Sequence, residues 1–269
     1  MPELPEVETT KNGLIPHLLN NIINEIKIHY PSLRYPIPKK LIQILENKKV
    51  IAINRRAKYL LIEFDCGSLL IHLGMSGSLK VLNKKEPLIK HDHFEIIFKN
   101  NQSLRLNDPR RFGFVLWQDD KQHQQLKNLA PEPLSEEFNN NYLFPLLKNK
   151  NKSIKGLIME QKFVVGVGNI YASESLFLSK INPTTKAKDI SKKQSQLLIK
   201  NIKTTLEKAI KAGGTTLKDF SNIEGKAGYF SQELKVYGRE NKHCFLCNDK
   251  IFKIQQHGRA TFYCPSCQK

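Results

Sequence analysis

The fold of the first half of this chain is decided by the stretch Tyr59-Leu60-Leu61-Ile62-Glu63-Phe64-Asp65-Cys66-Gly67-Ser68-Leu69-Leu70-Ile71-His72-Leu73. Residues 59–64 and 69–73 are dominated by aliphatic and aromatic side chains, and each run has the length of an ordinary strand. Asp65-Cys66-Gly67 supplies a turn between them. The stretch therefore predicts two neighbouring strands.

The same pattern continues on both sides of this stretch. Apolar side chains predict further strands at residues 22–28, 93–98 and 112–117, with a turn at Asn100-Asn101. The segment before them, residues 3–20, is predicted to be a helix. Many short strands with tight turns predict a sandwich of antiparallel sheets.

The composition changes near Pro131-Glu132-Pro133, where strand patterns give way to helical ones. Helices are predicted at residues 143–159 and 170–179, and along a segment that Ser191 begins and Gly213-Gly214 ends. The end of the chain is short, polar and rich in cysteine. We therefore predict three parts: an N-terminal β-sandwich domain over 1–132, a helical domain over 133–234 and a short cysteine-rich domain over 235–269.

Four of the five cysteines form two pairs near the end of the chain, Cys244-x2-Cys247 and Cys264-x2-Cys267. Each pair places two thiolates on one side of a tight turn, and two such knuckles on a hairpin complete a tetrahedral zinc site. A redox role is less favoured, because neither pair opens a helix in a βαβ unit. Four protein ligands leave no position for water, so one structural Zn²⁺ without a part in catalysis is predicted.

The chain carries 43 basic and 25 acidic side chains, a formal net charge of +18. Such an excess favours a polyanionic partner, because each neutralised phosphate releases counterions. A biased genome composition would explain part of the lysine excess. The positions of the arginines are stronger evidence for such a partner than the lysine excess. Five of the eight fall in the motifs described below: Arg55, Arg56, Arg110, Arg111 and Arg259. We therefore expect a nucleic-acid partner.

Membrane insertion and secretion are not expected for this chain. It has no run of about 20 apolar residues and no charged-then-apolar leader. A soluble protein in the cytoplasm is therefore expected.

The first residues, Met1-Pro2-Glu3, contain two groups that can take part in chemistry: the amine of Pro2 and the carboxyl group of Glu3. Initiator Met is normally removed before a residue as small as Pro, which would leave Pro2 with a free secondary amine. Such an amine has a pKa of about 8, so part of it is neutral, and it can attack the anomeric carbon of a sugar to form an iminium ion. Glu3 is placed to protonate the sugar ring oxygen. Activity requires removal of Met1, because the Pro2 nitrogen is otherwise an amide.

Further motifs follow in a fixed order along the chain. They are Pro2-Glu3-Leu4-Pro5-Glu6-Val7-Glu8-Thr9, Arg55-Arg56-Ala57-Lys58-Tyr59-Leu60-Leu61, His72-Leu73-Gly74-Met75-Ser76-Gly77, Lys90-His91-Asp92-His93, Asp108-Pro109-Arg110-Arg111-Phe112-Gly113, Val165-Gly166-Val167-Gly168-Asn169-Ile170-Tyr171-Ala172-Ser173-Glu174-Ser175 and Gly213-Gly214-Thr215-Thr216-Leu217-Lys218-Asp219-Phe220. With the cysteine ribbon, they closely resemble the motifs of bacterial formamidopyrimidine-DNA glycosylases, from residue 2 to the end.

The resemblance implies an α+β fold of two domains. An N-terminal β-sandwich with flanking helices would be followed by a helix-two-turns-helix domain that ends in the zinc-ribbon hairpin. It also implies a bacterial base excision repair enzyme, a monomer associated with the nucleoid, that acts on double-stranded DNA. Such an enzyme excises oxidised purines, above all 8-oxoguanine and formamidopyrimidines, and then nicks the strand as a lyase by β,δ-elimination.

The same resemblance assigns the catalytic roles. Pro2 matches the nucleophile and Glu3 the acid that acts on the sugar. Lys58 matches a DNA-contacting acid for the first elimination, and Arg259 matches a group that assists the second and contacts phosphate. The residues alone leave two interpretations of Arg259. It could contact a nucleic acid, in a groove or at a phosphate, or it could be a solvated residue at the tip of the hairpin.

The resemblance also assigns DNA contacts. Met75, Arg110 and Phe112 match residues that fill the gap left by an everted base, which suits an apolar wedge and an aromatic ring. Without the resemblance, Met75 and Phe112 would equally suit a core. His91 and Asn169 match phosphate contacts. A further phosphate-contacting lysine is expected in a basic run, but its register leaves four candidates open: Lys148, Lys150, Lys152 and Lys155.

Two alternatives remain. Endonuclease VIII, a related glycosylase for oxidised pyrimidines, shares the Pro-Glu start and the ribbon, but the continuation Leu4-Pro5-Glu6-Val7-Glu8 resembles the purine enzyme. A non-catalytic zinc-ribbon protein that binds DNA or RNA would explain the charge and the cysteines. It would not explain the motifs of Pro2, Glu3 and Lys58.

Overall fold

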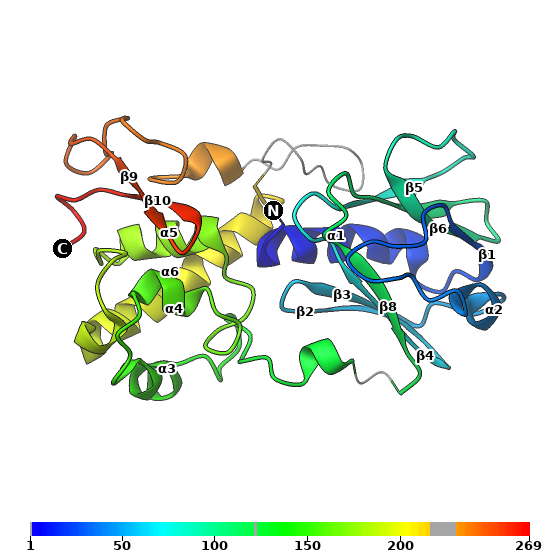
Figure 1. Cartoon of the computed structure of the whole chain (residues 1–269), viewed down its shortest axis with the longest axis horizontal. Coiled ribbons are helices and arrows are strands. Elements are labelled where there is room, and N and C mark those ends of the chain that lie inside the picture. Colours follow the sequence, from blue (N-terminus) through cyan, green and yellow to red (C-terminus); the bar gives the residue numbers. More distant parts are fainter. Residues whose placement is uncertain (1, 121–122, 216–229) are drawn as a thin grey trace. The chain divides into compact units, whose positions relative to one another are not determined.

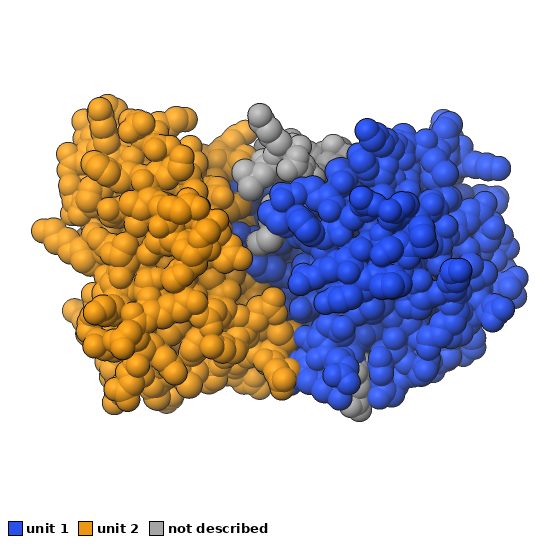
Figure 2. Space-filling view, viewed as in Figure 1, with its two compact units in different colours: residues 1–127, 212–229 blue, residues 128–211, 230–269 orange. Residues whose placement is uncertain are grey.

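The computed structural model describes residues 2–120, 123–215 and 230–269. These residues form two compact units, coloured separately in Figure 2. The first holds described residues up to 127 together with 212–215, and the second holds 128–211 and 230–269. The chain therefore has the two-domain organisation that was expected, while the domain limits at 132 and 234 stay predictions.

The first unit is built from ten helices and strands of the described chain (Figure 1). They are α1 (Leu4–Leu18), β1 (Ile23–Ile28), α2 (Leu41–Leu45), β2 (Ala52–Arg56), β3 (Tyr59–Phe64), β4 (Gly67–His72), β5 (Ser78–Leu82), β6 (Asp92–Phe98), β7 (Ser103–Asn107) and β8 (Phe114–Gln118), followed by the 3₁₀ turn η1 (Gln124–Leu126).

These strands form two antiparallel four-stranded sheets, in the orders β1-β6-β7-β5 and β2-β3-β4-β8. Both sheets contribute to one large apolar core, for example through Ile96 of the first and Ile62 of the second. Leu14 of α1 belongs to the same core. The expected β-sandwich with flanking helices is therefore confirmed.

The stretch that opened the sequence argument forms the hairpin β3–β4, with Phe64 opposite Gly67. The predicted strands at 22–28, 93–98 and 112–117 correspond to β1, β6 and β8 with small shifts of their ends. Sequence patterns missed β2, β5 and β7, because polar side chains alternate with the apolar ones in these short segments.

The second unit contains helices and one hairpin. Its elements are α3 (Asn140–Leu147), α4 (Ile154–Ile158), α5 (Asn169–Leu178), η2 (Ala187–Asp189), α6 (Lys192–Lys211), η3 (Phe230–Glu233), β9 (Phe252–Gln256) and β10 (Arg259–Tyr263). Among the described residues, no helix is long and apolar enough to cross a membrane.

One helix had been predicted over residues 143–159, and the structure has two, α3 and α4. Asn149 between them has a φ of 64°, a left-handed conformation that interrupts a helix. Ser153 then begins α4, because its hydroxyl accepts a hydrogen bond of 3.2 Å from the Gly156 N–H. The single-helix prediction was therefore wrong in this segment.

Helix α4 leads into α5 through residues 159–168, where the backbone makes two consecutive turns. The N–H of Glu160 donates to Leu157 O at 3.0 Å, and that of Phe163 donates to Glu160 O at 3.0 Å. This is the helix-two-turns-helix arrangement that was expected. Helix α6 begins as predicted, because the Ser191 hydroxyl accepts from the Gln194 N–H at 3.2 Å.

Strands β9 and β10 form a hairpin beside the cysteines. Its apolar support is small and consists of Phe177, Val236, Cys244, Ile251, Phe262 and Cys264. Two of these six residues are expected metal ligands. The hairpin therefore has far less apolar support of its own than the sandwich.

Candidate active site and nucleic-acid interface

The N-terminal residues lie at the beginning of α1, and Met1 lies outside the described residues. Pro2 is buried, and Glu3 is 1% exposed. Glu3 is the N-cap of the helix, where a side-chain oxygen can accept from the free N–H groups of the first turn. The structure thus places the expected nucleophile and acid next to each other in a buried position.

Glu6 holds this start in place, although sequence reasoning gave it no role. Its carboxylate accepts a hydrogen bond of 2.8 Å from the Glu3 N–H, which closes a capping box. The other oxygen accepts from the N–H and hydroxyl of Thr215, at 2.8 and 2.9 Å. The Glu-x-x-Glu spacing was the signal that could have identified it. The rest of the motif that includes Thr215, residues 216–220, lies outside the described residues.

Lys58 lies in the two-residue turn between β2 and β3. The neighbouring Ala57 has a φ of 55°, and its carbonyl accepts a hydrogen bond of 2.8 Å from Arg55. Arg55 also donates to Glu8 of α1 at 2.6 Å. The turn that carries Lys58 is therefore fixed to the helix that carries Glu3.

The Arg55–Glu8 pair is electrostatically favourable. Burial opposes the charged form of Glu8, but hydrogen bonds and charge from Lys11 and Arg55 outweigh it and lower the pKa of Glu8. The carboxylate therefore stays ionised near neutral pH, and the link between α1 and the Lys58 turn persists.

His72, at the end of β4, is a polar group near Lys58 that was not singled out from the sequence. Burial, with the charges of Lys58 and Arg34, lowers its pKa to about 4. Its Nδ1 accepts a hydrogen bond of 3.0 Å from the Gly74 N–H. A neutral ring with Nδ1 as acceptor carries its proton on Nε2, so His72 can act as an uncharged donor.

Two loops of the first unit are joined by Asp108, which is fully buried. One carboxylate oxygen accepts from the Ser76 hydroxyl at 2.6 Å, and the other accepts from the Gly113 N–H at 2.8 Å. Gly74 has a φ of 61°, and a Cβ there would lie 2.4 Å from the Gly113 nitrogen. Only glycine fits this close approach.

These joined loops carry the three residues expected to fill the gap in the DNA. Met75 and Phe112 remain 37% and 45% exposed, which excludes the core-packing interpretation. The guanidinium of Arg110 lies 5.1 Å from the centre of the Phe112 ring, a cation–π contact. An exposed aromatic ring beside an arginine and an exposed methionine are therefore both present on the joined loops.

The expected phosphate contact His91 lies in the turn before β6. Its φ is 76°, an uncommon conformation for a residue other than glycine. Its carbonyl accepts a hydrogen bond of 3.0 Å from the Asp108 N–H. The turn is thus joined to the residue that organises the two loops.

In the second unit, Asn169 is the first residue of α5, after Gly168 at the N-cap. Its Oδ1 accepts a hydrogen bond of 2.6 Å from Lys155, and its Nδ2 donates to Ala260 O at 2.9 Å. The side chain therefore holds the hairpin against the helix. The expected contact of Asn169 with phosphate stays a prediction.

Lys155 is 2% exposed, unlike the other lysines of the basic run. Its Nζ donates to Thr261 Oγ1 at 2.6 Å as well as to Asn169. Lys148, Lys150 and Lys152 are exposed. Lys155 therefore joins α4 to Asn169 of α5 and to Thr261 of the hairpin. Which lysine contacts phosphate stays open.

Arg259 is exposed at the first position of β10, next to the turn His257-Gly258. Both turn residues have positive φ, 48° and 73°, as a tight hairpin turn requires. His257 Nε2 lies 3.3 Å from Ser153 Oγ, at the start of α4. The expected hairpin tip is confirmed, and it is fixed to α4.

The four expected ligands lie together, with all of their Sγ atoms within 4.8 Å of one another: Cys244, Cys247, Cys264 and Cys267. Two of the Sγ–Sγ distances are 3.4 and 3.9 Å. Four sulfurs bound to one zinc ion at the usual Zn–S length are about 3.8 Å apart. The cluster therefore has the size of a metal site.

Comparisons with known proteins agree with this geometry. Residues 1–115 match the family model of the formamidopyrimidine-DNA glycosylase N-terminal domain, and residues 129–221 match that of the H2TH domain. The chain is 57% identical over 268 residues to a formamidopyrimidine-DNA glycosylase of Ruthia magnifica, with all of both chains covered.

Solved structures give the same result. A complex of Lactococcus lactis Fpg (MutM) with DNA that contains N7-benzyl-Fapy-dG matches with a TM-score of 0.93 and 35% identity, and all of both chains is covered. A complex of the wild-type lactococcal protein with DNA that contains an oxidised pyrimidine matches with a TM-score of 0.92, 35% identity and the same coverage.

Proposed function

The chain belongs to the formamidopyrimidine-DNA glycosylase family and is a DNA glycosylase of base excision repair, and we propose that it excises oxidised purines from double-stranded DNA. Its substrates would be 8-oxoguanine and ring-opened formamidopyrimidines. After base release, it would nick the strand by β,δ-elimination as a lyase, and it would act as a monomer.

The buried start of α1 is the observation that carries this proposal. With Met1 removed, the Pro2 amine attacks C1′ of the damaged nucleotide, and the bond between C1′ and the base breaks. Glu3 protonates the ring oxygen, which opens the sugar and leaves an iminium ion between Pro2 and C1′. The buried position of Glu3 directly beside Pro2, with its backbone N–H bound to Glu6, supports this role.

Elimination then breaks the strand. The carbon next to the iminium ion, C2′, loses a proton to water, and the electrons of that C–H bond form an enamine that expels the 3′ phosphate. Loss of a C4′ proton in the same way then expels the 5′ phosphate. We assign Lys58 to the first step and Arg259 to the second. The link from the Lys58 turn to α1 through Arg55 and Glu8 supports the first assignment.

The exposed residues of the joined loops would hold the DNA open. A base inside the stack hides its glycosidic bond, so it must be everted and its place filled. Met75 and Phe112 suit insertion between bases, and Arg110 suits hydrogen bonding to the orphaned partner base. The exposure of both apolar side chains supports these roles. His91 and Asn169 are assigned to phosphates.

We assign the cysteine cluster to one structural zinc ion. Thiolate ligands in a tetrahedral arrangement are typical of closed zinc sites, and the sulfur spacing fits. When bound, the ion would hold the two knuckles together and keep the hairpin that carries Arg259 in shape. The chemical steps themselves would be carried out by side chains and the N-terminus.

The choice of lesion is tested with matched duplexes. We expect faster cleavage of DNA that contains 8-oxoguanine or formamidopyrimidine than of DNA that contains thymine glycol. The thymine glycol duplex is needed in this comparison because the lactococcal relative has been crystallised with DNA that contains an oxidised pyrimidine. Faster release of thymine glycol would favour the endonuclease VIII-like alternative. Absence of any borohydride-trapped complex would contradict the iminium intermediate and, with it, the proposed lyase activity.

A further inference from the structure

The loop before β6, residues 83–90, has no buried side chain. Leu88 and Ile89 are themselves more than half exposed. Apolar packing therefore does not determine the conformation of this loop, and its shape depends on the polar groups that contact its backbone. The loop leads directly into His91, so these contacts act on the position of His91 together with the hydrogen bond from the Asp108 N–H to the His91 carbonyl.

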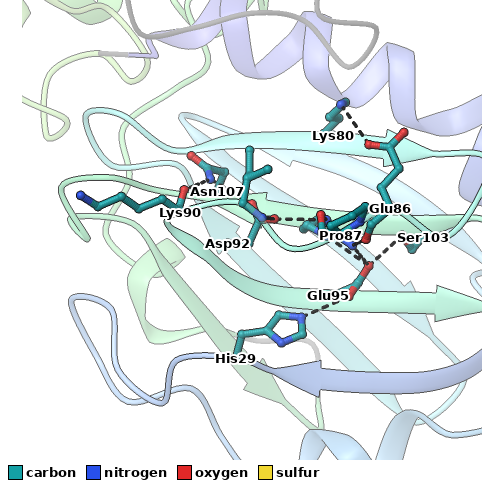
Figure 3. Close-up of polar contacts among 11 residues, drawn as sticks. His29, Lys80, Glu86, Pro87, Lys90, Asp92, Glu95, Ser103 and Asn107 are labelled. Atoms are coloured by element: carbon teal, nitrogen blue, oxygen red, sulfur yellow. Dashed lines mark hydrogen bonds and ion pairs between the residues drawn. The ribbon is translucent and has the colours of Figure 1, made fainter.

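Arg105 of β7 makes two of these contacts, although only 7% of it is exposed. One of its terminal nitrogens donates to Pro87 O at 3.0 Å, and the other donates to Glu86 O at 3.1 Å. The planar guanidinium fork can reach both carbonyls at once. Figure 3 shows Glu86 and Pro87 beside this polar cluster, on the face of β6 and β7.

Two carboxylates fix Arg105 in turn. Asp92 lies 3.2 Å from one guanidinium nitrogen, and Glu95 lies 2.8 Å from the other. Burial raises the pKa of Glu95, but hydrogen bonds from Arg105, Ser103 and His29 outweigh this effect and lower it. Glu95 is therefore ionised near neutral pH, and the arginine is held in a fixed orientation.

Asp92 and Asn107 contact the end of the loop, where the two residues face each other across β6 and β7. Asp92 accepts from the Ile89 N–H at 3.0 Å. Asn107 Nδ2 donates to Lys90 O at 3.0 Å and to Asp92 at 2.9 Å. In Figure 3 the carbonyl of Lys90 faces Asn107, while its side chain extends away from the cluster.

The backbone around His91 needs this support. Its φ of 76° is unfavourable for a residue with a Cβ, and the register between β6 and β7 shifts between Asp92 and Phe94. Such irregularities are often used to redirect a side chain next to a functional site. Without the contacts to residues 89 and 90, the bond from the Asp108 N–H to the His91 carbonyl would remain, but we expect the turn to relax towards a more favourable φ and the imidazole to move.

We propose that Arg105, Asp92 and Asn107 are positioning residues that fix the turn Lys90-His91 in the conformation that presents His91 to a DNA phosphate. This inference rests on the phosphate contact proposed for His91. The three residues lie under the loop and act through its backbone.

A double-mutant cycle tests the proposal on the whole protein. Affinity is measured for a duplex with a stable abasic-site analogue, using Asn107→Ala, His91→Ala and the double variant. Each single change is expected to weaken binding about 3- to 10-fold, the scale of one or two hydrogen bonds. The double variant should bind no more weakly than His91→Ala, because Asn107 acts through His91.

Asn100→Ala is the matched control. Asn100 makes two hydrogen bonds in the turn at the other end of β6 and β7, to Gln102 at 2.9 and 3.0 Å. Its loss should leave affinity unchanged. Arg105→Lys keeps the charge but loses the fork, so it should weaken binding in the same non-additive way.

Three results separate the possible failures. If His91→Ala does not weaken binding, the phosphate contact itself is wrong, and the positioning role fails with it. If His91→Ala weakens binding and Asn107→Ala does not, only the positioning role is wrong. If both weaken binding and their effects add, Asn107 acts independently of His91, and the proposal is again overturned.

Discussion

The two units fix their loops with buried groups of opposite charge. In the first, the Asp108 carboxylate accepts hydrogen bonds from Ser76 and Gly113 and joins the loops that carry Met75 and Phe112. In the second, the Lys155 ammonium donates to Asn169 and Thr261 and joins a helix to the hairpin. A buried charge is costly unless it is hydrogen-bonded, so both groups demand one specific loop arrangement.

The support beneath these groups differs between the units. Asp108 belongs to a sandwich whose large core contains residues from both sheets and from α1. The hairpin has a core of six residues, of which Cys244 and Cys264 are expected zinc ligands. The first unit should therefore keep its shape without metal, and the hairpin should not. We accordingly assign base release, with Pro2 and Glu3, to the first unit. Metal-dependent DNA binding, together with the help of Arg259 in the second elimination, is assigned to the hairpin.

The largest effect expected from this division is on the rate of base release in the variant Glu3→Gln. The change keeps the shape of the side chain and removes a transferable proton, so release of 8-oxoguanine should fall about 10²- to 10⁴-fold. Binding of an abasic-site analogue should be nearly unchanged, because it requires no proton transfer. Single-turnover rates and affinities measure both. Near wild-type release would remove Glu3 from the mechanism.

Zinc removal should lower DNA affinity, whereas Glu3→Gln should lower only the rate of base release. Loss of the hairpin also removes Arg259, and one charge-assisted contact is commonly worth about 10- to 100-fold in affinity. We expect DNA affinity to fall at least this far after chelation, while circular dichroism retains the signal of the β-sandwich. Unchanged affinity in verified metal-free protein would contradict the division between the units.

The contribution of Lys155 is expected to be smaller. Lys155→Met keeps the length of the side chain but leaves Asn169 and Thr261 without their donor, so affinity should fall about 3- to 10-fold. Lys162→Met is the matched control, because Lys162 is exposed, lies outside the basic run and pairs with Glu160 at 2.9 Å. An equal or larger loss of affinity for Lys162→Met would contradict a specific role of the buried Lys155.

The smallest effect concerns pH. The folded pKa of His72 is about 4, below its ordinary value of 6.5, so the unfolded chain takes up a proton first as the pH falls. His72 should therefore reduce the stability of the first unit between about pH 6.5 and pH 4, and have no effect above this range. Unfolding of wild type and His72→Asn across this range measures it. Equal pH dependence in both proteins would contradict a neutral, buried His72.

Sequence patterns predicted the features that depend on local chemistry. The turn before Gly67, the Ser191 cap and the spacing of the four cysteines each follow from one short segment. The hairpin tip at His257-Gly258 was predicted for the same reason. These features need no knowledge of the rest of the fold.

Features that depend on distant partners could not be predicted in this way. Arg105 looks like an exposed residue in a polar strand, and only the pairing of β6 with β7 brings it to Asp92 and Glu95. Lys155 was one of four equivalent lysines until the hairpin, about a hundred residues later, supplied its acceptor Thr261. Burial of a charged side chain is a tertiary property, and hydrophobic periodicity does not report it.

The central claim is that the Pro2 amine forms the covalent intermediate. The most direct test is to trap the complex with borohydride on a duplex that contains 8-oxoguanine, digest the protein and locate the adduct by mass spectrometry. We predict an adduct on Pro2, in a peptide that begins at Pro2 because Met1 has been removed. An adduct on Lys58, or a trapped chain that still carries Met1, would contradict the mechanism.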